Sequence, residues 1–251
     1  MPRLTSIGAA VVVLVIVPAV ARAQTAQRPF VRDVAGEVAC GPQAAIVAPV
    51  PTLRISGGTE TVSALFAKGD AVIVSGGTSQ GVQPGQVYFV RRVVPDRFTT
   101  PLSGGLEVTS VHTAGWLRIL EARADVAIGT ITQACDGIET GDYLEPFELP
   151  VVPPSSAGGE PDYSAPGRLI LADDRRQIGS AGSLMVLDRG TDHGLKPGQR
   201  LTIYRETVGG KGPASRIGEA TALVVSAETA LVRIDSSRDA VYVGDLVALH
   251  R

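Results

Sequence analysis

The sequence predicts an all-β protein built from two small β domains that repeat each other. A ten-residue segment, Gly77–Gln86 (GTSQGVQPGQ), recurs at Gly190–Gln199 (GTDHGLKPGQ), a shift of 190 − 77 = 113 residues. Short apolar runs flank both copies, as strands flank a tight turn. The chain also has 29 glycines and 17 prolines, which a turn-rich β fold requires. We therefore expect two tandem small β barrels or folded sheets after a cleaved signal peptide.

Each copy of the repeat contains x-Pro-Gly-x, the residue pattern of a type II turn. A phosphate-binding loop would need Gly-Lys-Ser/Thr opening a helix, and neither copy has it. A Gly-Asp pair before the last strand also recurs. The residues predicted to form structural turns are Gly77, Gly81, Pro84, Gly85, Gly141, Asp142, Gly190, Gly194, Pro197, Gly198, Gly244 and Asp245.

The repeat sets the domain boundaries. We expect a signal peptide at residues 1–23, an extended segment at 24–51, a first β domain at 52–148, a Pro/Ser/Gly-rich linker at 149–166 and a second β domain at 167–251. The first copy has ten more residues between Arg92 and Gly115 than the second has at the matching place. This insert predicts a longer hairpin loop, with Pro95–Ala114 as a contact surface. Thr59–Lys68 fits either a short helix or a strand.

The first residues predict export. Arg3 precedes the apolar run Ile7–Val20, and Ala21-Arg22-Ala23 has the form of a cleavage site. The alternative is a single transmembrane anchor, although this run is short for a span of about 20 residues. We expect no membrane span after cleavage and a periplasmic or secreted bacterial protein.

The two cysteines, Cys40 and Cys135, are predicted to form a disulfide because export leads to an oxidising compartment. A pair of buried free thiols is the alternative. The three histidines have no metal-ligand spacing, and two cysteines alone do not make a metal site. We expect no metal and no cofactor.

The charge balance excludes a basic binding surface. The chain has 23 Lys and Arg against 25 Asp and Glu, and loss of Arg3 and Arg22 with the signal changes the net charge from −2 to −4. We therefore expect no nucleic-acid partner.

The order of these features resembles a known envelope domain. An apolar strand, the G-[ST]-x-x-G-[VL]-x-P-G-Q segment, a strand ending at Arg92 or Arg205 and a later Gly-Asp pair resemble the C-terminal domain of the flagellar assembly protein T. The resemblance covers both repeats. It implies SH3-like β barrels and a bacterial cell-envelope setting, and it brings no catalytic residues.

Candidate chemistry is sparse. Gly77–Gly81 matches the G-x-S-x-G elbow of serine hydrolases, but a strand rather than a helix is expected after it. Asp142 and Asp245 recur, and a carboxylate that bonds nearby backbone N–H groups explains them without glycosidase chemistry. A possible ligand-contact patch consists of Arg91, Arg92, Trp116 and Arg118.

The sequence thus predicts a non-enzymatic exported bacterial envelope protein, acting as a structural or protein-interaction module with an envelope protein partner. The alternatives are a peptidoglycan- or glycan-binding module that uses Trp116 and the Arg91/Arg92 patch, and a serine hydrolase that uses Ser79.

Overall fold

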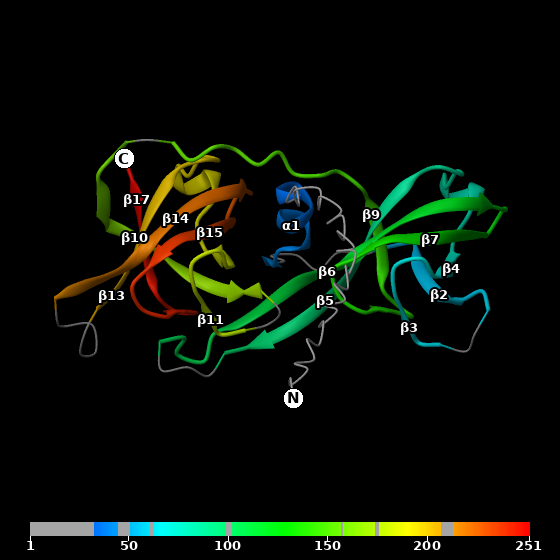
Figure 1. Ribbon diagram of the computed structural model, residues 1–251, viewed down its shortest axis with the longest axis horizontal. Helices are drawn as coiled ribbons and strands as arrows, with labels where there is room; N and C mark the ends of the chain where they lie inside the picture. Colours follow the sequence, from blue (N-terminus) through cyan, green and yellow to red (C-terminus); the bar gives the residue numbers. More distant parts are fainter. Residues whose placement is uncertain are drawn as a thin grey trace, which may run out of the picture. The chain divides into compact units, whose positions relative to one another are not determined.

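The computed structural model describes residues 33–44, 51–60, 63–98, 102–156, 158–173, 176–206 and 213–251. The predicted signal peptide, residues 1–23, lies outside this part of the chain. The described residues form two six-stranded antiparallel β barrels and one short helix (Figure 1). None of their helices is both long and apolar enough to cross a membrane.

The first barrel closes as the ring β2-β4-β7-β6-β5-β9. A single pair, Arg54 opposite Tyr143, joins β9 to β2 and completes the ring. The short strand β1 is added to the outside of β6, and β3 pairs with β8 as a separate ribbon. The strands are β1 Gln43–Ala44, β2 Arg54–Gly58, β3 Leu65–Phe66, β4 Ala71–Ser75, β5 Val87–Arg97, β6 Glu107–Ala122, β7 Val126–Ala134, β8 Ile138–Glu139 and β9 Tyr143–Pro146.

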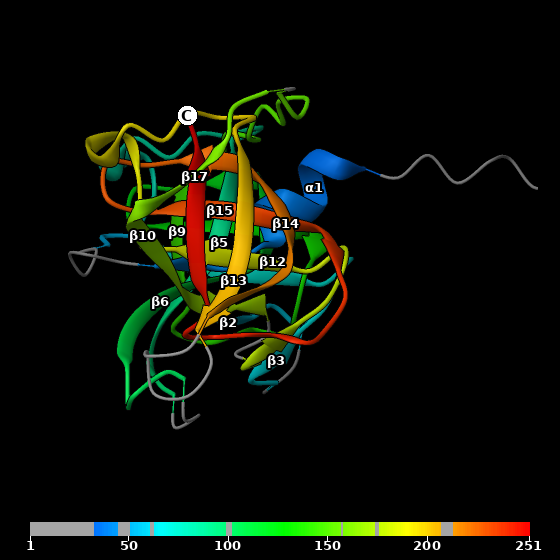
Figure 2. The same cartoon turned by 90° about the vertical axis from the view of Figure 1, so that its left-hand side faces the viewer.

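The second barrel closes as the ring β10-β12-β15-β14-β13-β17. Figure 2 looks onto this barrel and shows β17 between β10 and β13. A ribbon of β11 and β16 matches the β3–β8 ribbon of the first barrel. The strands are β10 Pro161–Ala172, β11 Ile178–Gly179, β12 Leu184–Leu187, β13 Arg200–Glu206, β14 Ala214–Val225, β15 Ala230–Ser237, β16 Val241–Tyr242 and β17 Leu246–His250.

The two rings have the same strand order, so the predicted all-β fold with a tandem repeat is confirmed. Each strand of the first barrel has a counterpart in the second, from β2 and β10 to β9 and β17. Within Thr59–Lys68, where a helix or a strand fitted the sequence, the chain forms strand β3.

The repeated turns adopt the conformation that their residues predict. Gly85 and Gly198 have φ angles of 89° and 81°, in the left-handed region that favours glycine. Gln86 N donates to Gln83 O at 3.3 Å, which closes the first turn. A single 3-10 turn lies between strand β4 and the first Pro-Gly turn, at η1 Thr78–Gln80, and between β12 and the second, at η3 Thr191–His193.

The segment predicted to be extended contains a helix instead. Helix α1 runs from Val34 to Cys40, and the Asp33 side chain accepts a hydrogen bond from Gly36 N at 3.0 Å at its start. The predicted disulfide between Cys40 and Cys135 is formed, and it fixes the end of α1 to the residue after β7. Val38 of α1 belongs to the hydrophobic core of the second barrel.

Much of Pro95–Ala114, predicted as a long hairpin loop, is strand, because β5 continues to Arg97 and β6 begins at Glu107. The insert lengthens β5 and β6 into an antiparallel arm in which Pro95 lies opposite Thr109. Phe98 follows the arm's first strand, is 2% exposed and packs in the core of the second barrel. The arm is therefore a packing element, and much of the proposed contact surface is covered.

The segment predicted as a linker, residues 149–166, is partly strand and lies along the second barrel. Strand β10 begins at Pro161, inside this range. Before it, Ser156 N donates to Gly198 O at 2.7 Å, and Glu160 N donates to Arg251 O at 3.1 Å. These bonds hold the linker along the second barrel.

Candidate functional site

The two recurring carboxylates are structural. Asp142 and Asp245 are 3% and 1% exposed. Asp142 accepts from the backbone N–H of Glu139 at 2.8 Å, and Asp245 accepts from that of Tyr242 at 2.8 Å. At both positions the carboxylate thus bonds to the backbone three residues earlier in the chain.

Each of these carboxylates also binds a recurring arginine, which lies within β5 in the first barrel and within β13 in the second. Arg92 donates from Nε and Nη2 to the two Asp142 oxygens at 2.6 and 2.8 Å, and Arg205 donates in the same way to Asp245 at 2.7 and 2.8 Å. The hydrogen bond to Asp142 raises the pKa of Arg92 above its ordinary value. Arg92 therefore has a structural role and does not face the other residues of the predicted ligand patch.

This pairing was not found in the sequence, although a signal for it exists. The arginine and the aspartate both recur, 50 residues apart in the first copy and 40 in the second. The difference of ten residues equals the length of the insert. When two residues both recur in a repeat although an insertion changes their spacing, the pattern indicates that they contact each other in the repeated fold.

The other candidate residues make local contacts, through the backbone at Ser79 and through the side chain at the histidines. Ser79 lies in the 3-10 turn η1, in an exposed position, and its N–H donates to Ala124 O. In the second copy, His193 accepts a hydrogen bond from Gly190 N at 3.4 Å. His112 contacts Asp136 at 3.1 Å, and His250 contacts the Thr202 hydroxyl at 2.8 Å.

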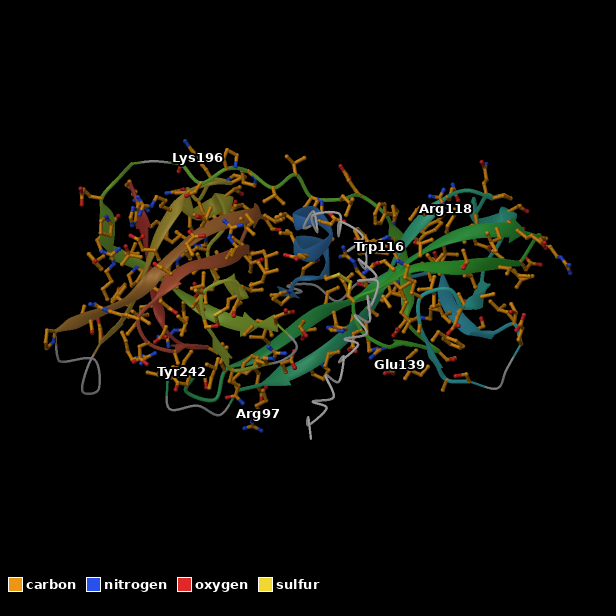
Figure 3. The ribbon with its side chains drawn as sticks, in the orientation of Figure 1. Arg97, Trp116, Arg118, Glu139, Lys196 and Tyr242 are labelled. Carbon is orange, nitrogen blue, oxygen red and sulfur yellow. A yellow bond between two sulfur atoms is a disulfide. The ribbon has the colours of Figure 1, made fainter. Side chains whose placement is uncertain are left out.

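Three residues of the predicted ligand patch lie on one outer face of the β5–β6 pair. Trp116 is opposite Phe89, and their rings meet edge to face with centroids 6.0 Å apart. Arg91 lies over the other side of this cluster, with its guanidinium carbon 4.7 Å from the Phe89 ring centre. Arg118, two residues after Trp116, is exposed on the same face of β6 (Figure 3).

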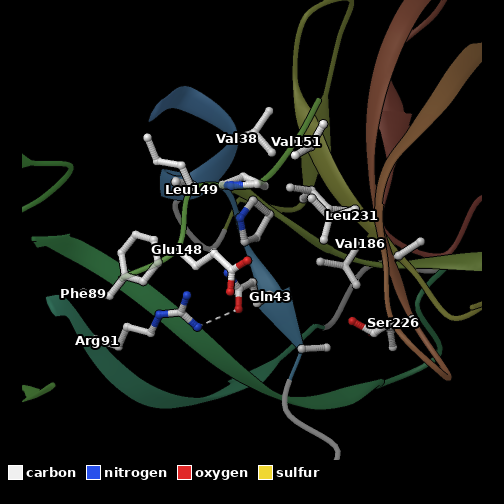
Figure 4. Close-up of a pocket in the computed structure, with 17 residues that line it drawn as sticks. Val38, Gln43, Phe89, Arg91, Glu148, Leu149, Val151, Val186, Ser226 and Leu231 are labelled. Carbon is white, nitrogen blue, oxygen red and sulfur yellow. Dashed lines mark hydrogen bonds between the residues drawn. The ribbon is translucent and has the colours of Figure 1, made fainter. Parts of the chain in front are cut away.

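Arg91 and Phe89 also line a pocket of about 380 Å³. Its walls come from α1 and β1, from β5, from the start of the linker and from the second barrel (Figure 4). Most of the lining residues are apolar. Beside the pocket, a Cβ at Gly41 would lie 2.9 Å from the Leu184 side chain, so a larger residue there would require that leucine to shift. The lining residues are Val38, Ala39, Pro42, Gln43, Ala44, Phe89, Arg91, Glu148, Leu149, Pro150, Val151, Val186, Val224, Ser226, Thr229, Ala230 and Leu231.

The Arg91 guanidinium points into this pocket (Figure 4). Its side chain is 12% exposed, and both of its polar contacts use Nη1, to the Gln43 side-chain oxygen at 2.9 Å and to Glu145 at 3.0 Å. Its Nε is buried and has no hydrogen-bond partner among the described residues. A buried donor without an acceptor costs about 1–3 kcal/mol, so an acceptor that reaches Nε would stabilise the site.

Glu148 is the second charged residue in the pocket lining. It is exposed and forms no ion pair within the described part of the chain. Arg91 is already paired with Glu145, which makes the surroundings of the pocket net negative. The arrangement can bind an apolar group and one hydrogen-bond acceptor.

Metal chemistry finds no support in the residues that the structure describes, where no three His, Cys, Asp or Glu side chains gather as ligands. No protein-family model matches the chain, and no curated protein matches it.

Proposed function

We propose that this chain is an exported, non-enzymatic protein of the bacterial cell envelope that acts as a structural and protein-interaction module. The observation that carries the proposal is the pocket beside β1. Its lining includes apolar side chains and Arg91, whose buried Nε has no acceptor among the described residues. Apolar pockets with a few convergent polar groups are the usual form of binding sites.

A partner segment has a natural place beside this pocket. Strand β1 pairs with β6 along one edge, and within the described residues no strand pairs with its other edge. Gln43 and Ala44 of β1 both line the pocket. An extended segment added to this edge would place alternate side chains against the apolar walls.

Support for export and for a role without catalysis comes from different residues. The signal-like residues 1–23 and the Cys40–Cys135 disulfide fit an oxidising compartment outside the cytoplasm. Asp142 and Asp245, the recurring acids, are each held by an arginine and a backbone N–H, which leaves them to a structural role.

The SH3-like assignment belongs to the same proposal. Two six-stranded barrels with the G-x-x-G and Pro-Gly turns support the resemblance to the C-terminal domain of the flagellar assembly protein T. The bacterial envelope setting follows from that resemblance.

The test is site-specific crosslinking in the native envelope. A photo-crosslinking residue in place of Val151, which is 89% exposed and lines the pocket, should capture a partner protein. The captured protein should then bind the purified chain, residues 24–251, and Arg91→Lys should lower the affinity of that binding. The matched control is Leu65 on β3, which is 60% exposed and outside the pocket. Equal capture from both positions, or a captured protein that binds regardless of Arg91, would count against the proposal.

A second candidate function, peptidoglycan or glycan binding, is favoured by the aromatic face. Trp116, Phe89 and Phe147 have ring centroids between 4.7 and 6.0 Å apart, and Arg91 and Arg118 lie on the same face. Co-sedimentation of the oxidised chain with purified sacculi tests this function. Pelleting that resists moderate salt and is lost in a folded Trp116→Ala variant would establish it, whereas pelleting unchanged in that variant would exclude this face.

A further inference from the structure

The three arginines that follow the repeated turn segments use their donors differently. Arg92 and Arg205 each present Nε and Nη2 side-on to one buried carboxylate. Arg91, the neighbour of Arg92, has an acidic partner at Nη1 only, and its Nε has no acceptor among the described residues. Among the described residues, Arg91 Nε is therefore a buried donor at the pocket wall that a bound acceptor would satisfy.

Charge decides which acceptor suits this donor. Glu145 already neutralises Arg91, and Glu148 adds a further negative charge to the lining. A ligand carboxylate would be the third carboxylate near one guanidinium, and like charges that close disfavour each other. A backbone carbonyl accepts the same hydrogen bond without adding charge.

The remaining contacts favour an extended segment with a basic side chain. The walls formed by Phe89, Leu149 and Leu231 suit apolar side chains, and the free edge of β1 suits a strand. Glu148, exposed at this pocket and without an ion pair in the described chain, suits a lysine or arginine.

We propose that the pocket binds an extended, apolar peptide segment of a partner protein that carries no acidic side chain, places a backbone carbonyl at Arg91 Nε and directs a basic side chain to Glu148. This inference rests on the proposed function and specifies the chemistry of the partner at the same site.

The test uses two probes that differ in one charge. The peptides Ac-Val-Leu-Val-Lys-Val-amide and Ac-Val-Leu-Val-Glu-Val-amide are titrated into the ¹⁵N-labelled chain, residues 24–251, and dissociation constants are read from NMR shifts of pocket residues. The lysine peptide should bind more tightly by about three- to tenfold, since exposed ion pairs contribute little each and the glutamate adds repulsion. Glu148→Lys should reverse the order, while the exposed Glu121→Lys, outside the pocket lining, should leave it unchanged.

The Arg91 Nε–H signal gives an independent measurement. It should shift when the lysine peptide binds, because its N–H gains an acceptor. Arg91→Lys should weaken both peptides by about tenfold or less, the worth of one hydrogen bond to a charged donor. Equal affinity for the two peptides, with no effect of Glu148→Lys, would overturn the inference while leaving a peptide-binding pocket. Binding of neither peptide would also overturn it, and crosslinking from Val151 would still decide the proposed function.

Discussion

Replacing the buried Asp142 with asparagine should destabilise the first barrel. The same change at an exposed aspartate of this barrel should cost much less. The carboxylate accepts from Arg92 Nε, from Arg92 Nη2 and from Glu139 N, all within 2.8 Å. Removing one partner of a buried ion pair costs about 3–5 kcal/mol. The Arg92 side chain is 26% exposed and keeps its contact with Glu139, so we expect a smaller loss of about 2–3 kcal/mol.

Urea unfolding followed by Trp116 fluorescence measures this loss, because Trp116 is the only tryptophan and lies on β6. The midpoint should fall by about 1–2 M at the slope usual for a small domain. Asp125→Asn, at an exposed turn, is the control and should stay within about 0.5 kcal/mol of the parent. The double variant Arg92→Met/Asp142→Leu should lose less than the sum of its single changes, since both buried polar groups are removed together. An Asp142→Asn variant as stable as the control, or additive losses in the double variant, would refute this reasoning.

Three further changes probe other parts of the fold. Cys40→Ser/Cys135→Ser should lower the free energy of unfolding by up to about 4–5 kcal/mol, the chain-entropy value for a 95-residue separation. Thermal unfolding of the parent with and without reductant checks this, and equal Tm values in the two conditions would show that the bridge contributes nothing. Phe98→Ala should cost about 3 kcal/mol in urea, because the arm loses a side chain buried in the second core, and a loop-like role would leave stability unchanged. Burial lowers the pKa of His250 below its ordinary value of 6.5, so the stability contributed by the neutral side chain is full above pH 6.5 and is lost as the pH falls. His250→Gln should therefore flatten the dependence of Tm on pH between 7.5 and 5. A variant whose Tm falls with pH as steeply as that of the parent would argue against this role.

The sequence was most informative where a feature depends on one or two residues. The Pro-Gly turns follow from Pro84 and Gly85 themselves, because proline sets φ and glycine accepts its positive value. The same local logic failed for the insert, whose extra residues predicted a longer hairpin loop. Strand β5 pairs with β9 only as far as Arg91, and beyond it one edge of β5 has no partner strand within the described residues. An edge strand tolerates a proline such as Pro95 because the missing N–H can face the unpaired side.

The pocket could not be predicted because no local pattern describes it. Its walls bring Val38, Phe89, Glu148 and Leu231 together from segments far apart in the sequence. The sequence did single out Arg91 and Trp116, because the arginines were expected on neighbouring strands and Trp116 has Glu219 at the matching place of the second repeat. It could not separate Arg91 from Arg92, whose roles differ because successive strand residues face opposite sides.

The duplication explains the fold, and the differences between the copies explain the pocket. Leu223 of the second barrel is 1% exposed, whereas its counterpart in the first, Leu120, is 50% exposed. Helix α1, the arm and the linker all contribute residues that pack against the core of the second barrel. Val224, which lines the pocket, has Glu121 as its counterpart. A site of this kind therefore depends on the additions outside the repeat, and a search for the partner should start from the face of the second barrel that these additions reach.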